Sequence, residues 1–268
     1  MDSLRLESIK NFTATLAREV GEIQRRHFGH LSQVEHKGPV DLVTPIDRMC
    51  EEIIVSRISS RFPDHDIVAE ESDLPRTGSA FRWYVDPLDG TTNYVHGYPC
   101  FGVAIGLEVE DEMMLGVVHD PTRDETFCGM KGGGAFLNGR RISVSGTIDL
   151  DQSLLATGFP YDIRESRENN IDYFTRFSLV SQGVRRDGSA ALDLCYVAMG
   201  RFDGFWEMRL APWDLAAGSL MITEAGGLVT DFRYGHFRMD SDEVLATNGL
   251  IHEQMVSILN EEKTGGGS

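Results

Sequence analysis

Two carboxylates and a glycine turn directly follow the apolar run 83–85 in the segment Asp86-Pro87-Leu88-Asp89-Gly90-Thr91-Thr92-Asn93. The apolar run predicts a strand, so we expect Asp86 to leave its carboxyl end and Asp89 to lie one turn further on, where both can face one cation. Gly90 allows the backbone to approach a phosphate closely. Oxygen ligands at this spacing favour Mg²⁺, with Mn²⁺ as the alternative ion. The segment therefore predicts a metal–phosphate site, and a solvated Asp-Pro turn is the simpler alternative.

Two more acidic residues stand at the ends of expected elements. Glu70 follows the short apolar run 67–69, and Asp214 follows Pro212-Trp213 at the start of a predicted helix. Carboxylates from separate elements can hold the ions that neutralise phosphoryl oxygens and activate water for hydrolysis of a phosphate ester. Each residue alone is more commonly a surface charge or a helix cap. Their joint position at element ends favours a shared cation site in one cleft.

The composition excludes several classes of partner. The chain has 268 residues, 41% of them hydrophobic, and its 42 acidic and 25 basic residues give a net charge of −17. This charge repels a polyphosphate backbone, so we expect no nucleic-acid partner. The start of the chain lacks a signal-peptide core and no apolar run has the length of a membrane span, so we expect no membrane association and a cytoplasmic location. The four cysteines form no Cys-x-x-Cys pair, which argues against disulfides or a zinc site: Cys50, Cys100, Cys128 and Cys195.

Hydrophobic periodicity predicts a mixture of helices and strands. Apolar residues at intervals of three or four predict a long amphipathic helix over about residues 9–28. Thr44 is a suitable N-cap for a second helix, with Pro45 at its first position. Residues 101–145 alternate short β-favouring runs with turns, as an antiparallel meander does. In the second half we expect strands at 154–156, 202–206, 228–229 and 244–246, and helices at 169–181, 189–199, 215–222 and 248–259.

The acidic motifs, taken in order, resemble the signature of the Mg²⁺-dependent, lithium-sensitive inositol monophosphatase superfamily. The resemblance covers Phe12 to about Leu259, and the run Arg185-Arg186-Asp187 is similar to bacterial members. The matching positions are Asp41, Glu70-Glu71, Asp86 to Thr91, and Trp213-Asp214 with Glu224-Ala225-Gly226-Gly227. The resemblance implies an α/β (α+β) fold, a layered αβαβα sandwich of the inositol monophosphatase/fructose-1,6-bisphosphatase type.

The same resemblance predicts one phosphatase domain over residues 1–262. Residues 1–146 would form a metal-binding half and residues 147–262 a substrate-completing half. Residues 263–268 form a Gly-rich run that predicts a flexible tail. The resemblance also implies a homodimer.

The resemblance implies a set of metal ligands for two to three Mg²⁺ ions. Glu70, Asp86 and the Leu88 carbonyl would hold the first ion, and Asp86, Asp89 and Asp214 the second. Glu70 would also help to hold a weaker third ion. Lys37, Asp41 and Glu71 are accessory candidates near that third site.

Catalytic and substrate-binding roles follow from the same resemblance. Glu70 and Thr91, with Asp47 polarising Thr91, would activate a metal-bound water for direct in-line attack on phosphorus. The backbone N–H groups of Gly90 and Thr91 would receive the phosphate at the start of a helix. The substrate hydroxyls would meet the residues that match the substrate contacts of the inositol monophosphatase branch: Gly188, Ser189, Ala190 and Glu207. The expected activity is hydrolysis of inositol monophosphate to inositol and phosphate.

Three alternatives stay open from the sequence. Fructose-1,6-bisphosphatase or histidinol-phosphatase activity would use the same scaffold. A haloacid dehalogenase phosphatase carries an Asp-x-Asp-Gly-Thr motif, in which the nucleophile and the acid–base residue are two positions apart. Here Asp86 precedes Asp89 by three positions, which argues against this alternative. An acidic cation-binding or protein-interaction module would explain the charge but needs no Gly-Thr phosphate turn.

Overall fold

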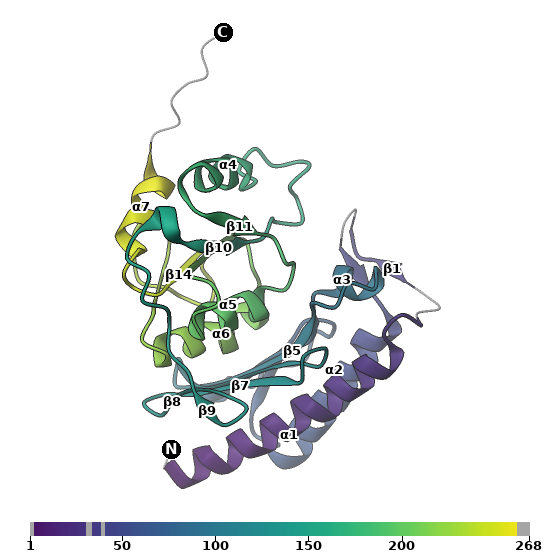
Figure 1. Ribbon diagram of the computed structural model, residues 1–268. Coiled ribbons are helices and arrows are strands. Elements are labelled where there is room, and N and C mark those ends of the chain that lie inside the picture. Colours follow the sequence, from purple (N-terminus) through teal and green to yellow (C-terminus); the bar gives the residue numbers. More distant parts are fainter. Residues whose placement is uncertain (1–2, 31–33, 39–40, 262–268) are drawn as a thin grey trace.

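A computed structural model describes residues 3–30, 34–38 and 41–261 of the chain. Figure 1 shows five layers, beginning with two helices that lie side by side under a large sheet. These helices are α1 (Ser3–His27) and α2 (Pro45–Arg61). Their apolar sides pack with the sheet in one hydrophobic cluster, which includes Ile9, Val20 and Ile54.

The middle helices separate two sheets, and the outer helices cover the second sheet (Figure 1). The middle layer consists of α5 (Ala190–Ala198) and α6 (Pro212–Glu224), both buried over most of their length. The outer layer consists of α4 (Ile171–Val180) and α7 (His252–Asn260). The expected αβαβα sandwich is therefore confirmed.

The first sheet has seven strands in the order β3-β4-β5-β6-β7-β8-β9. Only β3 and β4 are parallel, and every other neighbouring pair is antiparallel, which confirms the meander expected over residues 101–145. The strands are β3 (Asp66–Ala69), β4 (Phe81–Asp89), β5 (Gly102–Val109), β6 (Glu112–Asp120), β7 (Glu125–Met130), β8 (Gly134–Leu137) and β9 (Arg140–Arg141).

The second sheet has five strands in the order β11-β10-β12-β14-β13. They are β10 (Leu154–Thr157), β11 (Gly183–Arg185), β12 (Gly204–Met208), β13 (Leu228–Thr230) and β14 (Glu243–Thr247). The short edge strand β11 was not predicted, because its three residues carry no alternating pattern. The smaller elements are β1 (Glu35–His36), which pairs with β2 (Leu42–Val43), the five-residue α3 (Thr91–Val95), and a 3₁₀ turn over Leu150–Gln152.

Local signals set the ends of several helices. Thr44 caps α2 as predicted, and its side chain and the Asp47 carboxylate form a reciprocal capping box with Pro45 at the first position. The last helix differs from the prediction, because Asn248 is not its cap. Asn248 instead accepts hydrogen bonds from the N–H groups of Leu250 and Ile251, and the helix begins only at His252.

The interior joins the two halves of the chain. One hydrophobic cluster contains Val118 and Phe127 from the first sheet, Leu194 from α5, and Phe205 and Ala246 from the second sheet. Three of the four cysteines are buried and the fourth is partly buried, all of them as free thiols. The boundary near residue 146 and the single-domain assignment stay predictions, and the tail at residues 263–268 lies outside the described residues.

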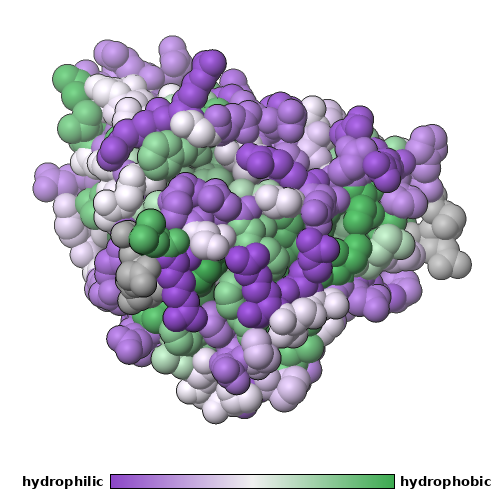
Figure 2. Space-filling model, turned by 90° about the horizontal axis from the view of Figure 1, so that it is seen from below, coloured by the Kyte–Doolittle hydropathy of each residue, from purple (hydrophilic) through white to green (hydrophobic). Residues whose placement is uncertain are grey.

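Among the described residues, no helix combines the length and apolar character required to cross a membrane. The face shown in Figure 2 is covered mostly by hydrophilic side chains, and hydrophobic ones are visible in smaller areas between them.

Candidate metal and phosphate site

The end of β4 differs from the sequence prediction in a way that matters for chemistry. Asp86 does not leave the strand, since β4 continues through Asp89. Asp86 pairs with Ala104 and Asp89 with Gly102, so three steps along β4 oppose two along β5. Side chains three residues apart in a regular strand point to opposite faces. The extra residue offsets this alternation, as a β-bulge does, so both carboxylates can reach one site.

Asp214 completes a group of three carboxylates. One carboxylate oxygen from each of Asp86, Asp89 and Asp214 lies within 4.8 Å of the others. Asp214 occupies the third position of α6, where its Oδ2 accepts a hydrogen bond from the N–H of Ala211 at 2.8 Å. The same residue is therefore both a capping acid and a member of the cluster.

Glu70 joins this group from the neighbouring strand. Strands β3 and β4 are parallel and Ala69 pairs with Val85, so Glu70 follows at the same level as Asp86. The N–H of Glu70 donates to the Val85 carbonyl at 3.2 Å, and after burial the charge of Glu70 is the main cause that raises the pKa of Asp86. The four acidic residues singled out in the sequence thus come together in space.

The electrostatics of the cluster indicate a cation site. Burial, followed by the charges of Glu70 and Asp89, raises the pKa of Asp86 well above its ordinary value. Burial and the charge of Asp89 raise the pKa of Asp214 in the same way. Burial also raises the pKa of Glu70 to about 7, although the Lys37 ammonium opposes this shift. Carboxylates placed this closely favour their charged form only beside a cation, and an all-oxygen set suits Mg²⁺.

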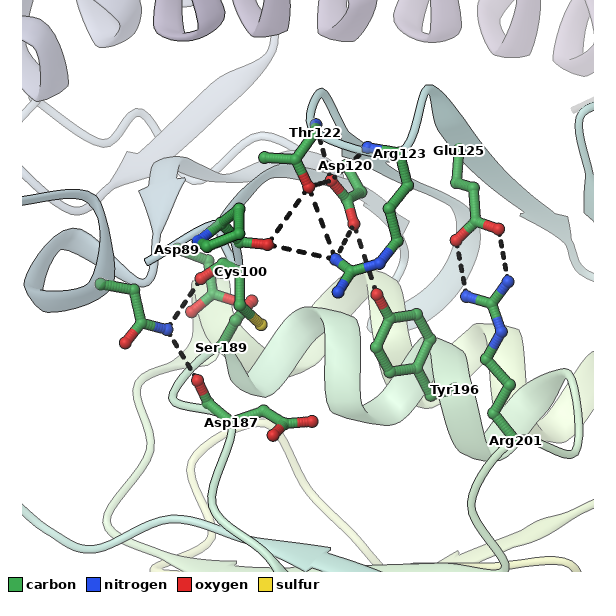
Figure 3. Close-up of polar contacts among 12 residues, drawn as sticks. Asp89, Cys100, Asp120, Thr122, Arg123, Glu125, Asp187, Ser189, Tyr196 and Arg201 are labelled. Atoms are coloured by element: carbon green, nitrogen blue, oxygen red, sulfur yellow. Dashed lines mark hydrogen bonds and ion pairs between the residues drawn. The ribbon is translucent and has the colours of Figure 1, made fainter. Parts of the chain in front are cut away.

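Asp89 is fixed by the start of α5, as Figure 3 shows. The hydroxyl of Ser189 donates to Asp89 Oδ2 in a short hydrogen bond, and the N–H of Ala191 donates to the same oxygen at 2.9 Å. Ser189 is the N-cap of α5 and Ala190 its first residue. The sequence led us to expect Ser189 at the substrate, but the structure places its hydroxyl on a carboxylate of the metal cluster.

Thr91 and Asp47 are in contact, as the resemblance implied. The Thr91 hydroxyl lies 2.8 Å from Asp47 Oδ1 and 3.0 Å from the carbonyl oxygen of Leu88. The other oxygen of Asp47 accepts from the N–H of Thr44 at 2.9 Å and from its hydroxyl at 2.5 Å. Burial raises the pKa of Asp47, and these hydrogen bonds oppose the shift. Because the hydroxyl proton of Thr91 is committed to a protein acceptor, its oxygen remains available to accept a proton or hydrogen bond.

The backbone at Gly90 leaves no room for a side chain. Its φ is 94°, a left-handed conformation, and a Cβ there would lie 2.9 Å from the Cys100 carbonyl oxygen and 3.2 Å from that of Gly188. This residue is the N-cap of α3, so the N–H groups that open the helix follow directly behind Asp89.

Lys37 lies between the carboxylates of Glu70 and Glu71. Its ammonium is 2.5 Å from Glu71 Oε1 and 3.3 Å from Glu70 Oε1. Burial alone would lower the pKa of Lys37, but the charges of Glu70 and Glu71 raise it above its ordinary value. Asp41 acts here through its backbone, because its carbonyl accepts the N–H of Lys37 at 2.9 Å. Its carboxylate is not part of the three-residue cluster.

Glu207 lies on the second-half side of the site, on β12. It is buried, and burial raises its pKa to about 8, while the charge of Arg186 opposes the shift. A Cβ on Gly158 would approach Glu207 Oε1 to 2.0 Å. Gly158 is therefore a residue of the site that the sequence analysis missed, and its only signal is a glycine directly after β10.

Asn93 is a second residue that the sequence analysis did not assign. Its amide donates to the Cys100 carbonyl at 2.8 Å and to the Asp187 carbonyl at 2.7 Å, which ties the start of α3 to the segment before Gly188. Figure 3 shows Cys100 and Asp187, the two residues that this bridge joins, close to Asp89 and Ser189. Gly188 has a φ of 82°, and a Cβ there would lie 3.1 Å from the Asn93 amide nitrogen. The segment expected to bind substrate is thus held in place from the first half of the chain.

Comparisons with known proteins agree with this geometry. The Inositol monophosphatase family matches residues 5–264 of the chain. The inositol-1-monophosphatase of Synechocystis sp. is 47% identical over 234 residues, which is 87% of this chain and 82% of that protein. The Escherichia coli (strain K12) protein named Nus factor SuhB is 40% identical over 255 residues, which is 94% of this chain and 96% of that protein.

Solved structures lead to the same group of proteins. The structure of inositol monophosphatase from Anabaena (Nostoc) sp. PCC 7120 has a TM-score of 0.88 and 41% sequence identity, and the similarity covers 95% of this chain and 96% of that one.

Proposed function

Because the chain belongs to the inositol monophosphatase family, a family of Mg²⁺-dependent phosphatases, we propose that it hydrolyses inositol monophosphate to inositol and phosphate. The observation that carries this proposal is the meeting of carboxylate oxygens of Asp86, Asp89 and Asp214 within 4.8 Å, with Glu70 beside Asp86 at the end of the neighbouring strand. The haloacid dehalogenase alternative is set aside, because the family and the αβαβα layers are different.

Four carboxylates and one carbonyl would hold two to three Mg²⁺ ions. Glu70, Asp86 and the Leu88 carbonyl belong to one ion, and Asp86, Asp89 and Asp214 to the next. Bound Mg²⁺ would neutralise charge on the phosphoryl oxygens and lower the pKa of the attacking water. The hydrogen bonds from Ser189 and Ala191 hold Asp89 in orientation for this task.

Glu70, Thr91 and Asp47 would place and deprotonate the attacking water. Asp47 accepts the hydrogen bond that the Thr91 hydroxyl donates, so Thr91 Oγ1 can accept a hydrogen bond from the water. Glu70 follows β3 beside Asp86, and its carboxylate would take the proton of the attacking water. Attack is in line with the leaving oxygen, and no covalent phosphoenzyme forms.

The substrate would lie between the two halves of the chain. The N–H groups of Gly90 and Thr91 would bind the phosphate, and Glu207 would bind ring hydroxyls. The segment Gly188-Ser189-Ala190 would form the wall beside the ring, with Ser189 acting through Asp89. Lys37 and Glu71 would set the charge state of Glu70 beside the third ion. We further propose one phosphatase domain over residues 1–262, a cytoplasmic homodimer and inhibition by Li⁺.

A phosphate-release assay tests this proposal. Wild-type protein is expected to release phosphate from inositol 1-phosphate with Mg²⁺, and to lose this activity in EDTA and in the presence of Li⁺. Fructose 1,6-bisphosphate and histidinol phosphate are the comparison substrates, and faster release from either would reassign the substrate. An inactive wild type across the panel would favour a cation-binding or protein-interaction module instead.

A further inference from the structure

A large cleft lies along α6, apart from the four-carboxylate cluster. It has a volume of about 1020 Å³, which is at the upper end of the range for small-molecule pockets. Residues from the first sheet, from α6 and from the segment between β13 and β14 line it. Its apolar lining includes Val68, Tyr84, Met113, Leu220, Phe237 and Met239. No residue of the four-carboxylate cluster lines this cleft.

The acidic side chains around the cleft already have partners. Glu112 pairs with Lys131 at 2.5 Å, and Asp240 pairs with Arg238 at 2.8 Å. Glu224 accepts from the N–H groups of Gly132 and Gly134, both at 2.7 Å. Glu108 accepts from Arg82 at 2.6 Å and from the Tyr84 hydroxyl at 3.1 Å. Asp111, the fifth acid of the lining, is exposed and lies 3.8 Å from Arg82, so the close partners of the other four leave the rim little unmet demand for a cation.

Two cationic side chains in the lining differ from these acids. Among the described residues, the Arg76 side chain makes no hydrogen bond or ion pair. The Nε–H of Arg82 is buried and has no hydrogen-bond partner, although the rest of its guanidinium contacts Glu108. A buried donor without a partner costs stability, so a ligand oxygen would improve its environment. The Arg76 side chain and the Arg82 Nε–H thus favour an anionic ligand, and the apolar lining favours a ligand with a hydrophobic body.

The floor of the cleft consists of the elements that carry the metal-site acids. Val68 on β3 precedes Glu70 by two residues, and Tyr84 on β4 precedes Asp86 by two. These two residues form a buried cluster with Ala216 of α6, the helix that begins beside Asp214.

A smaller pocket links the cleft to the metal site. It has a volume of about 270 Å³, shares Val68 and Arg76 with the cleft, and is also lined by Glu70 and Trp213. A ligand in the cleft would therefore contact the three elements that position Glu70, Asp86 and Asp214.

We infer that this cleft is an effector site for a small amphipathic anion, and that its occupancy changes the affinity of the carboxylate cluster for Mg²⁺. The acidic group of the ligand would bind Arg76 and, after a rotation of the Arg82 side chain toward the cleft, the Nε–H of Arg82, and its hydrophobic body would lie on Val68, Tyr84 and Met239. Reciprocity requires that Mg²⁺ change the affinity for the anion by the same factor. Only the effect on Mg²⁺ rests on the proposed metal site, and binding in the cleft is independent of it.

Two fluorescent probes with the same aromatic body test the binding step. 8-Anilinonaphthalene-1-sulfonate carries the anion, and N-phenyl-1-naphthylamine lacks it. Arg76→Gln is expected to weaken sulfonate binding about tenfold and to leave the neutral probe unaffected. Arg82→Lys keeps a cation for Glu108 but removes the Nε–H, and it is expected to act in the same direction. Arg140→Gln is the matched control, because Arg140 is exposed and does not line the cleft.

Blocking the cleft provides a variant that leaves its charges intact. Thr223 is an exposed α6 residue in the lining, so Thr223→Trp is expected to fill the cleft without disturbing the core and to weaken both probes about tenfold. Sulfonate binding that is absent from wild type, or unchanged in Arg76→Gln and Thr223→Trp, would overturn the site.

A Mg²⁺ titration by calorimetry tests the effector role. The sulfonate probe is expected to change the Mg²⁺ affinity of wild type about fivefold or more, and to have no effect in Thr223→Trp. An unchanged Mg²⁺ affinity with the probe bound would overturn the effector role. A wild type that binds the probe but no Mg²⁺ would contradict the proposed function and the effector role, while the anion site itself would stand.

Discussion

Asp66 and Asp86 lie on neighbouring strands and are both buried, with 3% and 2% of their surface exposed, yet their environments are opposite. Asp66 accepts hydrogen bonds from the N–H and hydroxyl of Thr77 and from the N–H groups of Gly78 and Ser79. The backbone N–H of Thr77 is the main cause of its lowered pKa. Asp86 accepts one backbone N–H, that of Leu88, and faces other carboxylates. Hydrogen-bond donors stabilise the charged form of Asp66 without a metal. Asp86 has few donors and lies among other carboxylates, so its charged form requires a cation.

The largest expected effect is on catalysis at Asp86. Asp86→Asn removes the carboxylate proposed to bridge two ions, and we expect phosphate release to fall about 1000-fold, from a loss of about 4 kcal/mol of transition-state stabilisation. Asp66→Asn is the matched control and should retain most activity. Steady-state assays with saturating Mg²⁺ measure both variants. Equal losses in the two would contradict the distinction between them.

Thr91 should have a smaller effect that does not involve metal affinity. Thr91→Ala removes the hydroxyl between Asp47 and the site, and we expect kcat to fall about 10- to 100-fold while calorimetric Mg²⁺ binding is unchanged. Thr91→Ser keeps the hydroxyl and should recover most of the rate. A serine variant as slow as the alanine variant would argue against a role for this hydroxyl.

Stability without metal should move in opposite directions at the two aspartates. In EDTA, Asp86→Asn relieves repulsion among buried carboxylates, and we expect it to raise the free energy of unfolding by about 1 kcal/mol. Asp66→Asn loses hydrogen bonds to a charged acceptor and should lower it by about 2 kcal/mol. Denaturant titrations in EDTA provide both values, and a destabilised Asp86→Asn would count against the repulsion.

A further effect is a pH dependence of stability carried by Glu207. Its pKa is raised from 4.5 to about 8, so the folded protein binds this proton more tightly than the unfolded chain does. The resulting stability is fully present below about pH 4.5 and is lost as the pH rises through about 8. In EDTA, the free energy of unfolding of wild type should therefore fall more than that of Glu207→Gln between about pH 5 and pH 8, which is roughly the interval between the two pKa values. Melts with identical pH slopes would show that burial of Glu207 has no such effect.

Local signals in the sequence predicted much of the fold. The amphipathic pattern gave α1, the Thr44-Pro45 cap gave the start of α2, and acids at element ends gave Glu70, Asp86, Asp89 and Asp214. These features are visible because periodicity and capping act over a few residues. The motif resemblance supplied the layered architecture, which no local pattern specifies.

Features that depend on contacts between distant segments were not predictable. The bulge between Asp86 and Asp89 depends on pairing with β5, and the bond from Ser189 to Asp89 joins residues 100 apart in the chain. Gly158 matters only because Glu207 lies against it, and the cleft beside α6 forms from three separate regions. Such features follow from the packing of whole layers, so a short window of sequence carries no signal for them.

Anomalous diffraction from a crystal soaked in Mn²⁺ is the most direct test of the carboxylate cluster. We expect at least two peaks, each in contact with Asp86, one of them also contacting Glu70 and the other contacting Asp89 and Asp214. A fully soaked crystal with no peak among these four side chains would contradict a metal-dependent site.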